Sequence, residues 1–492
     1  MYVVVLDVGT SSMRGILADE QGRFLALKQI NYCPRYVTDR WIEQDAADFD
    51  SALTAIGKSM AEAAKEHHIQ ISCISVTSQR SAVIPVDRSG DPLMPAVMWQ
   101  DTRNADIVKR LKAQDDLVFS ISGAGVNTVF SGSKMTWIRE RCGDVYRKLY
   151  KYVTIPSYLM FRMTGSYFMD YTYASRSNLL DLKEKRWSTE LLELFRVKEE
   201  HLCTLIEPGM SVGTVTREFA NATGLTQGIP VVSAGGDQQC AAVGQGAFKE
   251  GVVSVVAGTG AFLVTACDSF PQNLKKDLTC NCSAVAGKYI LEANVLTCAS
   301  AFDWFRRMFY SDPQDYALIS RELAEACLEN SDEIVLPFFQ GRSFGGWNPD
   351  AKAYFGNITL STTRGEMLKA LLQGIFLEVY NGILAFEEYV PVREAYISGG
   401  MTKSGVMNQL QADIYGIRLH RGKNSESTAL GALLSALTAM GAYPDMDTAF
   451  MAAGPKNEDI YVPDREKTAQ YEKVRVEVNR LYGKINSKEK KR

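Results

Sequence analysis

Apolar and polar positions form short blocks from the first residues of the chain. Residues 3–6 are apolar and rich in valine, and the run ends on Asp7. Glycine and hydroxyl residues follow at positions 9–12, and positions 15–17 are small or apolar again. The first run is too short and too β-branched for a helix, so we expect a strand, a tight polar turn and a second strand.

The rest of the chain continues as an alternation of short apolar runs and segments with helical spacing. Such an alternation predicts an α/β fold. Predicted strands lie at residues 71–77, 82–86, 96–98, 230–234, 251–256, 262–265 and 395–397, and predicted helices at 49–60, 240–247, 366–386 and 430–440. The basic tail that ends in KINSKEKKR is expected to be a solvated end.

Near residue 248 the opening pattern starts again. A predicted strand at 251–256 runs into a turn of Gly258, Thr259 and Gly260, and a second strand follows. We interpret this as a weak internal repeat and as the start of a second domain. A chain of 492 residues also exceeds the roughly 250–300 residues at which single cores stop growing. We therefore expect domains at residues 1–246 and 247–492.

Polar side chains follow three of the predicted strands directly. In α/β sheets, ligands collect at the carboxyl ends of strands. The residues in these positions are Gln79 and Arg80 after strand 71–77, Trp99 and Asp101 after strand 96–98, and Asp237 and Gln238 after strand 230–234. Asp237 comes directly after two glycines and before a predicted helix, which is a favourable place for acting on a small ligand.

The first turn has the composition of a phosphate site. Its backbone N–H groups and the hydroxyls of Thr10 and Ser11 suit an oxyanion. Asp7 stands where the strand meets the turn and could hold Mg²⁺, while Arg14 could approach phosphate. An ordinary hairpin with a polar tip fits the turn equally well when it is taken alone. The turn is not a Walker loop, because no Gly-Lys-Ser/Thr follows.

Composition limits the partners and the location. The net charge of −3 gives no support for nucleic acid or an anionic membrane as a partner, and no run of about 18 apolar residues exists. Ten scattered cysteines without a disulfide-like spacing, and an N-terminus without the features of a signal peptide, indicate a cytoplasmic protein. The sequence does not show the oligomeric state, and a homodimer remains open.

Several segments in fixed order resemble the FGGY family of carbohydrate kinases, which belongs to the actin-like ATPase superfamily. The resemblance covers residues 3 to about 440. It implies an α/β protein with two actin-like ATPase (ribonuclease H-like) domains, each a mixed β-sheet flanked by helices, with ATP and sugar in a cleft between them. The segments are LDVGTSSMRG (6–15), AGGDQQCAAVGQG (234–246), VAGTGAF (256–262), GRSFGGWNPDAKAYFGNITLSTTRGEMLKALLQGI (341–375) and ISGGMTKSGVMNQLQADIYG (397–416), with WIEQDAADF and SGSKMTWIRER as further family segments.

The resemblance assigns roles to the turn residues and to Asp237. It implies a kinase that uses ATP and Mg²⁺, with Asp237 as the catalytic base and with Asp7 and Asp237 as metal contacts. The alternative for Asp237 is a structural N-cap of the following helix. The positions near Mg²⁺ and the phosphates are Asp7, Thr10, Ser11 and Arg14, the second phosphate loop is Gly258, Thr259 and Gly260, and Gly399 and Gly400 lie beside adenosine.

The candidate substrate contacts are Gln79, Arg80, Trp99, Asp101, Asp237 and Gln238. The Gln79–Arg80 pair is similar to that of glycerol kinases, yet the glutamate that follows the pair there is Ser81 here, and the tyrosine before Phe-Ser-Gly is Val129. Two polar contacts to a small triol are therefore absent, which argues against glycerol. A larger linear polyol, a ketose or a sugar acid stays open, and Arg80 fits an acidic sugar and neutral hydroxyls equally well.

Two other functions are compatible with a superfamily of this kind. One is a chaperone-like or filament-forming ATPase, which the Asp237 segment and the GRSFGGWNPD stretch argue against. The other is a sugar-sensing pseudokinase without turnover, which the retained Asp7, Asp237 and Gly-Thr turns argue against.

Overall fold

The computed structural model describes residues 1–327, 332–343, 348–422, 426–455 and 458–489. The chain forms two compact units. The first consists of Met1–Phe248, Cys267–Ile290 and Glu426–Pro455, and the second of Lys249–Ala266, Leu291–Ser425 and Lys456–Arg492. The expected division at residue 246 lies close to the point where the chain first passes from the first unit to the second. Two later segments then return to the first unit.

The core of the first unit is a six-stranded mixed sheet with the order β14-β15-β6-β1-β2-β3. The antiparallel β1–β2 hairpin confirms the predicted strand, turn and strand, and β6 runs parallel to both β1 and β15. The strands are β1 (Tyr2–Val8), β2 (Ser12–Asp19), β3 (Phe24–Asn31), β6 (Cys73–Ser78), β14 (Ser211–Thr214) and β15 (Pro230–Gly236).

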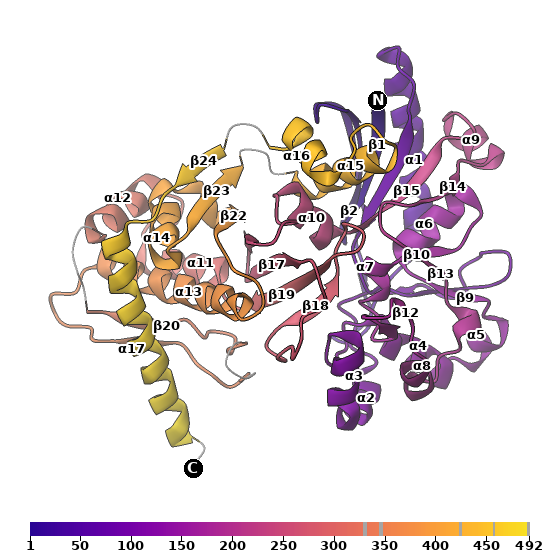
Figure 1. Cartoon of the computed structure of the whole chain (residues 1–492). Coiled ribbons are helices and arrows are strands. Elements are labelled where there is room, and N and C mark those ends of the chain that lie inside the picture. The colour runs from indigo at the N-terminus through magenta and orange to yellow at the C-terminus, as the bar shows by residue number, and fades with distance from the viewer. Residues whose placement is uncertain (328–331, 344–347, 423–425, 456–457, 490–492) are drawn as a thin grey trace. The chain divides into compact units, whose positions relative to one another are not determined.

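Both faces of this sheet are covered, which explains the continuous apolar run in β1. Because side chains alternate along a strand, Val4 and Leu6 pack toward α1 (Ala46–Glu66), while Val3 and Val5 join the cluster around α15 (Ser427–Ala439). The helix α1 buries the predicted stripe of apolar residues and begins at Asp45, whose side chain accepts a hydrogen bond from the Ala47 amide. In Figure 1, the yellow α15 lies beside the indigo β1, far from it in sequence.

Smaller elements complete the first unit. Four of them bear on the site: β8 (Ala96–Val97), α4 (Ser131–Arg141), α7 (Tyr171–Ala174) and α10 (Asp237–Gly244). The others are β4 (Arg35–Tyr36), β5 (Ile42–Gln44), β7 (Ile84–Val86), α2 (Ala105–Leu111), α3 (Asp115–Ser122), α5 (Gly143–Lys148), β9 (Lys151–Val153), α6 (Ile155–Thr164), β10 (Phe168–Asp170), β11 (Leu180–Asp181), β12 (Arg186–Trp187), α8 (Thr189–Phe195), β13 (Thr204–Ile206), α9 (Arg217–Thr223), β18 (Thr279–Cys282) and α16 (Met446–Ala453).

The second unit is also built on a mixed sheet, in which the strand order β19-β17-β16-β22-β23-β24 occurs. Its β16–β17 hairpin is antiparallel and β16 runs parallel to β22, so the arrangement of β2, β1 and β6 is repeated. The elements are β16 (Val252–Ala257), β17 (Ala261–Cys267), β19 (Tyr289–Val295), α11 (Ala299–Phe309), α12 (Tyr316–Ala326), β20 (Ile334–Leu336), β21 (Tyr354–Gly356), α13 (Arg364–Glu387), β22 (Glu394–Ser398), α14 (Gly405–Tyr415), β23 (Arg418–Gly422), β24 (Glu458–Tyr461) and α17 (Arg465–Glu489).

The helix α13 is the long apolar helix that the sequence predicts. By length and composition alone it could cross a membrane, but 78% of its apolar window is buried inside the protein, as is typical of a core helix. The helix α17 was not predicted, because it is polar on most of its surface. Within the FGGY-like stretch, residues 344–347 lie outside the described residues, as do residues 490–492 of the basic tail.

Candidate active site

Three parallel strands of the first unit bring the main candidates to one edge of the sheet. Thr77 of β6 is level with Asp7 of β1 on one side and with Gly235 of β15 on the other. Neighbouring strands lie about 4.8 Å apart, so the ends of β1 and β15 are separated by about 10 Å. The polar residues that follow these strands therefore share one small region, as the strand-end rule predicts.

The first turn has a closed backbone. The Gly9 amide donates to the Ser12 carbonyl (2.9 Å), and the Tyr32 hydroxyl donates to the Gly9 carbonyl (2.8 Å). Ser11, at the tip, is exposed, and Thr10 is half-buried. These bonds fix the shape of the turn and leave the Thr10 and Ser11 side chains at its surface.

Gln79 holds this turn from the neighbouring strand end. Its side-chain amide donates to the Gly9 carbonyl (3.0 Å), and its side-chain oxygen accepts from the Thr10 hydroxyl (3.3 Å). Gln79 is only 3% exposed. Both ends of the amide are therefore used within the protein, and the contact favours a positioning role for Gln79 over a direct substrate contact.

Asp7 and Arg14 face each other across the β1–β2 hairpin. The Arg14 guanidinium bridges two carboxylates, those of Asp7 and Glu426. Burial raises the pKa of Asp7, and the adjacent Arg14 opposes that shift. Glu426 precedes α15, so a segment that returns late in the chain contributes to the charge balance of the first turn.

Asp237 is the first residue of α10, and its side chain is partly exposed. The N-cap position belongs to Gly236, and no side chain caps this helix. The side chain of Asp237 is 28% exposed, and its Oδ1 lies 3.7 Å from Nε of Arg80. The alternative role of Asp237 as the N-cap is thus not what the structure contains.

Arg80 lies beside the start of α10 and is almost fully buried. Its Nη1 donates to the side-chain oxygen of Gln239 (3.2 Å). A Cβ on Gly236 would lie 2.7 Å from the Cδ of Arg80, so this glycine leaves the space in which the arginine runs. Gln238 is half-buried, and its backbone amide donates to Oδ1 of Asp237 (2.8 Å). Gln239, which sequence reasoning missed, is completely buried.

Trp99 connects the loop after β8 to the first turn. Its indole Nε1 donates to the Thr10 hydroxyl (3.0 Å), and the residue is 37% exposed. An exposed aromatic ring held by its polar edge is well suited to contact a ligand. Trp99 therefore belongs to the same group as Thr10, Arg80 and Asp237.

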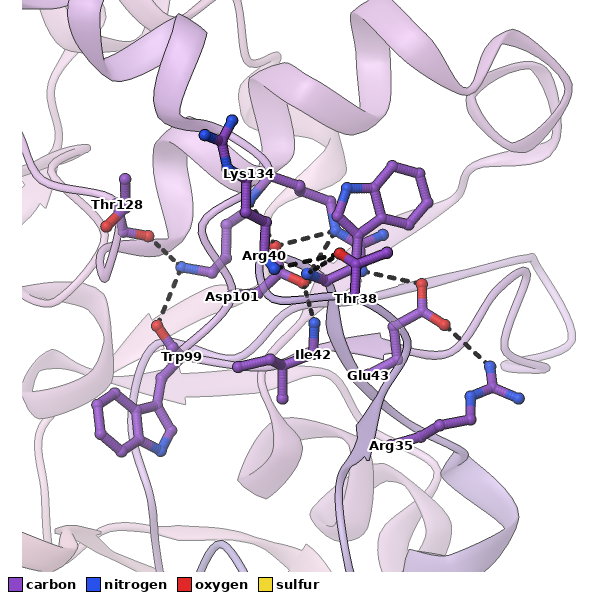
Figure 2. A network of polar contacts seen from close by, with 11 residues as sticks. Arg35, Thr38, Arg40, Ile42, Glu43, Trp99, Asp101, Thr128 and Lys134 are labelled. Atoms are coloured by element: carbon purple, nitrogen blue, oxygen red, sulfur yellow. Dashed lines mark hydrogen bonds and ion pairs between the residues drawn. The ribbon is translucent and has the colours of Figure 1, made fainter.

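Asp101 belongs to a different network of polar contacts, which Figure 2 shows around Ile42 and Glu43. Its carboxylate is completely buried and accepts from the Ile42 amide (2.6 Å) and from the amide and side chain of Arg103. Arg103 also binds Glu43, which in turn binds Arg35. Because its oxygens are occupied inside the protein, we interpret Asp101 as an anchor of the loop rather than as a substrate contact.

Ser81 does not replace the polar contact of a glutamate at this position. The residue has a φ of 73° and is 1% exposed. Its hydroxyl donates to the Arg176 carbonyl at 3.4 Å, and its side chain is therefore directed into the protein.

A buried carboxylate behind α10 is a further element that sequence reasoning missed. Asp170 accepts hydrogen bonds from the Ser233 hydroxyl and from the amide and hydroxyl of Thr172, and the Thr172 hydroxyl accepts from the Gly236 amide (2.9 Å). Burial raises the pKa of Asp170 to about 6. This network fixes the backbone just before Asp237. An Asp-x-Thr pattern signals a local cap, but nothing in the sequence indicates the link to residue 236.

The second unit holds the other predicted turn. The Gly258 amide donates to the Gly260 carbonyl (2.9 Å), and the Gly258 and Thr259 carbonyls accept from the first amides of α11. Gly399 has a φ of 99°, and a Cβ there would lie 2.3 Å from the Ala257 carbonyl oxygen. Gly400 has open space around it. The Gly258 turn and the Gly399 loop are therefore neighbours within this unit.

Comparison with known proteins covers nearly the whole chain. Residues 2–244 match the N-terminal domain, and residues 253–440 the C-terminal domain, of the FGGY family of carbohydrate kinases. The glycerol kinase of Thermococcus onnurineus (strain NA1) is 31% identical over 441 residues, which are 88% of this chain and 87% of that protein.

Solved structures share the fold at lower identity. The xylulose kinase from Rhodospirillum rubrum has a TM-score of 0.92 at 23% identity, with 99% of both chains covered. The gluconate kinase from Lactobacillus acidophilus has a TM-score of 0.87 at 23% identity, with 98% of this chain and 99% of that chain covered. The two matched domains meet close to residue 248, where the hairpin pattern starts again.

Proposed function

Because the chain belongs to the FGGY family of carbohydrate kinases, and has their two-domain α/β fold, we propose that it phosphorylates a hydroxyl of a sugar, polyol or sugar acid with ATP. The family makes the protein an enzyme, a phosphotransferase with an alcohol acceptor. Relatives named glycerol, xylulose and gluconate kinases cover the range of acceptors from polyol to sugar acid.

Asp237 is the general base in this proposal. It accepts the proton of the sugar hydroxyl as the oxygen attacks the γ-phosphorus in line. The observation that carries the proposal is the position of Asp237: a half-buried carboxylate at the start of α10, beside Arg80, at the strand edge that also carries the first turn. Gly236 occupies the N-cap position, so helix capping does not account for this carboxylate.

ATP is held, in this proposal, by the two Gly-Thr turns. Thr10, Ser11 and Arg14 contact the phosphates from the first turn, in which Ser11 is exposed and Thr10 half-buried. Gly258, Thr259 and Gly260 supply the second loop. Gly399 and Gly400 border adenosine, and the open space at Gly400 supports this role.

Magnesium fits the carboxylates at the strand edge. Asp7 lies near the carboxyl end of β1 and Asp237 directly after β15, about 10 Å away, and Mg²⁺ is commonly bound by one or two carboxylates together with waters and phosphate oxygens. No cluster of three or more His, Cys, Asp or Glu side chains occurs in the part of the chain that the structure describes, which is consistent with a metal that arrives with the nucleotide. When bound, the ion neutralises charge on the phosphates.

The acceptor site is proposed to consist of Arg80, Trp99, Asp237 and Gln238. Glycerol is disfavoured, because the Ser81 hydroxyl is directed at the Arg176 carbonyl and position 129 is a valine. A longer polyol, a ketose or a sugar acid can use Arg80 and the face of Trp99.

The protein is proposed to work in the cytoplasm on a small molecule, with no nucleic acid or membrane as a partner. None of the ten cysteines is in a disulfide, and nine of them are buried or half-buried, as is typical of a reducing compartment.

The test is a coupled ADP assay across pentoses, ketoses, polyols and aldonic acids. We expect one class to stimulate ADP formation, and Asp237→Asn to lower kcat by about 10²–10⁴-fold while sugar binding, measured by calorimetry, persists. Asp144→Asn, on an exposed carboxylate of α5, is the matched control. The proposal fails if no compound in the panel stimulates ADP release, or if Asp237→Asn turns over at the wild-type rate.

A further inference from the structure

A single buried lysine joins two loops next to the candidate acceptor site. Lys134, in α4, is completely buried. Its Nζ donates to the carbonyls of Thr128, of Val129 (2.8 Å) and of Trp99 (3.5 Å). Figure 2 shows the ammonium between the Thr128 and Trp99 carbonyls. Two separate segments, the Trp99 loop (residues 98–101) and the Val129 loop (residues 127–130), therefore share one donor.

A charged side chain is energetically unfavourable at this buried position. Burying an ammonium is unfavourable unless hydrogen bonds compensate, and here the partners are carbonyls rather than a carboxylate. Burial lowers the pKa of Lys134 to about 7, with Asp101 opposing the shift and Arg103 adding to it. An apolar side chain would fill the same volume without this penalty. The lysine thus supplies something other than packing, namely three directed donors.

One of the two loops that Lys134 holds carries Trp99, a proposed acceptor contact. The Trp99 indole donates to the Thr10 hydroxyl, and that hydroxyl donates to Gln79. A continuous series of hydrogen bonds thus leads from the buried ammonium through Trp99 to the first turn. In the Val129 loop, the Thr128 carbonyl also accepts from the Asn104 amide (3.1 Å), which fixes the same backbone from a second side.

We propose that Lys134 is a positioning residue that sets the spacing of the Trp99 and Val129 loops and thereby the affinity for the acceptor. This inference rests on the proposed function, in which Trp99 contacts the acceptor. Lys134 itself touches no substrate, because it is enclosed by protein. Loss of its donors releases two carbonyl groups in one loop and one in the other, so the loops move apart while the nucleotide residues of the second unit stay unchanged.

The experiment compares Lys134→Met with Lys369→Met. Lys369, in α13, is a second buried lysine whose pKa is lowered by burial, and it lies in the other unit. We expect Lys134→Met to raise the KM for the acceptor about tenfold or more, with the KM for ATP changed less than about threefold. Lys369→Met should leave the acceptor KM unchanged. Lys134→Gln, which keeps an amide with two N–H donors on a shorter side chain, is the variant to use if Lys134→Met does not fold, and it should give an intermediate acceptor KM.

Hydrogen–deuterium exchange separates this inference from the proposed function. Peptides that cover residues 98–101 and 127–130 should exchange faster in Lys134→Met than in the wild type, and no faster in Lys369→Met. This result would stand even if the wild type phosphorylated no sugar, in which case only the proposed function would fail. An unchanged acceptor KM, or unchanged exchange in both loops of a folded variant, would overturn the positioning role.

Discussion

The helix that carries Asp237 packs on a second helix through backbone contacts, and an added methyl group should disturb catalysis from a distance. A Cβ on Gly431 of α15 would lie 1.8 Å from the carbonyl oxygen of Cys240 in α10, and a Cβ on Gly244 would lie 2.0 Å from the Ser427 carbonyl oxygen. The two glycines therefore let the helices touch. We predict that Gly431→Ala separates them.

The size of the effect follows from the contact distance. Ordinary contact begins at 3.4 Å, so α10 and α15 must separate by 1.6 Å at this point. Overpacking of this kind destabilises the folded protein by about 1–3 kcal/mol, and the better helix propensity of alanine offsets about 1 kcal/mol of this loss. A shift of about 1 Å in a catalytic group can lower the rate about 100-fold. We therefore expect a folded protein whose kcat for the acceptor falls by about that factor.

The assay is steady-state ADP release at saturating ATP, with thermal unfolding followed by circular dichroism. Gly483→Ala is the matched control, because Gly483 lies in α17 with nothing within 4 Å of an added Cβ. It should raise stability slightly and leave kcat unchanged. If Gly431→Ala retains kcat within about threefold of the wild type, the helix contact does not set the position of Asp237, and the reasoning is wrong.

Three further predictions concern charge and space. Burial raises the pKa of Asp170 to about 6, so this carboxyl stays protonated to a higher pH in the folded state than in the unfolded state. The free energy of unfolding should therefore fall by about 3 kcal/mol as the pH rises from 4 to 6. Urea titrations of Asp170→Asn should lack that decline. Lys134 loses its proton near pH 7 in the folded state but only near pH 10.5 in the unfolded state. Between pH 7 and 10, the free energy of unfolding of the wild type should therefore rise relative to that of Lys134→Met by on the order of 1 kcal/mol per pH unit. A difference in stability that does not change with pH would refute this. The Cβ that Gly400→Ala adds would meet no protein atom within 4 Å, so the melting temperature should not change. An ATP KM that rises about tenfold would then report direct contact with the nucleotide. An unchanged ATP KM would remove Gly400 from the site.

The strand-end residues were the part of the site that the sequence could predict. A β-branched run that stops at a polar residue marks where a buried strand leaves the sheet, and parallel strands leave at the same edge. This argument brought together Asp7, Arg80 and Asp237, which the register of β1, β6 and β15 confirms. It needed no knowledge of the loops.

Whether a strand-end side chain faces a ligand or the protein could not be predicted. Asp101 and Gln79 occupy the same kind of position as Asp237, which is partly exposed, yet both are turned inward. Asp101 is held by the amide of Ile42, which is 59 residues away in sequence, and Gln79 by Gly9, which is 70 residues away. Partners at such separations depend on the completed fold, and a single sequence carries no local signal for them.

The membership of α15 in the first unit was unpredictable for a related physical reason. The hydrophobic pattern of a helix such as α15 is the same whichever sheet the helix covers. Its place in the first unit depends on complementary surfaces in that unit. The Ser75 hydroxyl donates to the Ala432 carbonyl. Gly431 has no side chain, so α10 can approach α15 closely at this point. Neither feature can be read from periodicity.

The position of α15 makes one helix a common support for both parts of the first unit's site. Glu426, just before the helix, binds Arg14, which binds Asp7 beside the first turn. Gly431, one turn later, contacts the helix that begins with Asp237. A displacement of α15 would therefore act on the proposed phosphate contacts and on the proposed base together. Substitutions in α15 should lower the affinity for ATP and the turnover in parallel, whereas substitutions at Lys134 should change acceptor affinity alone.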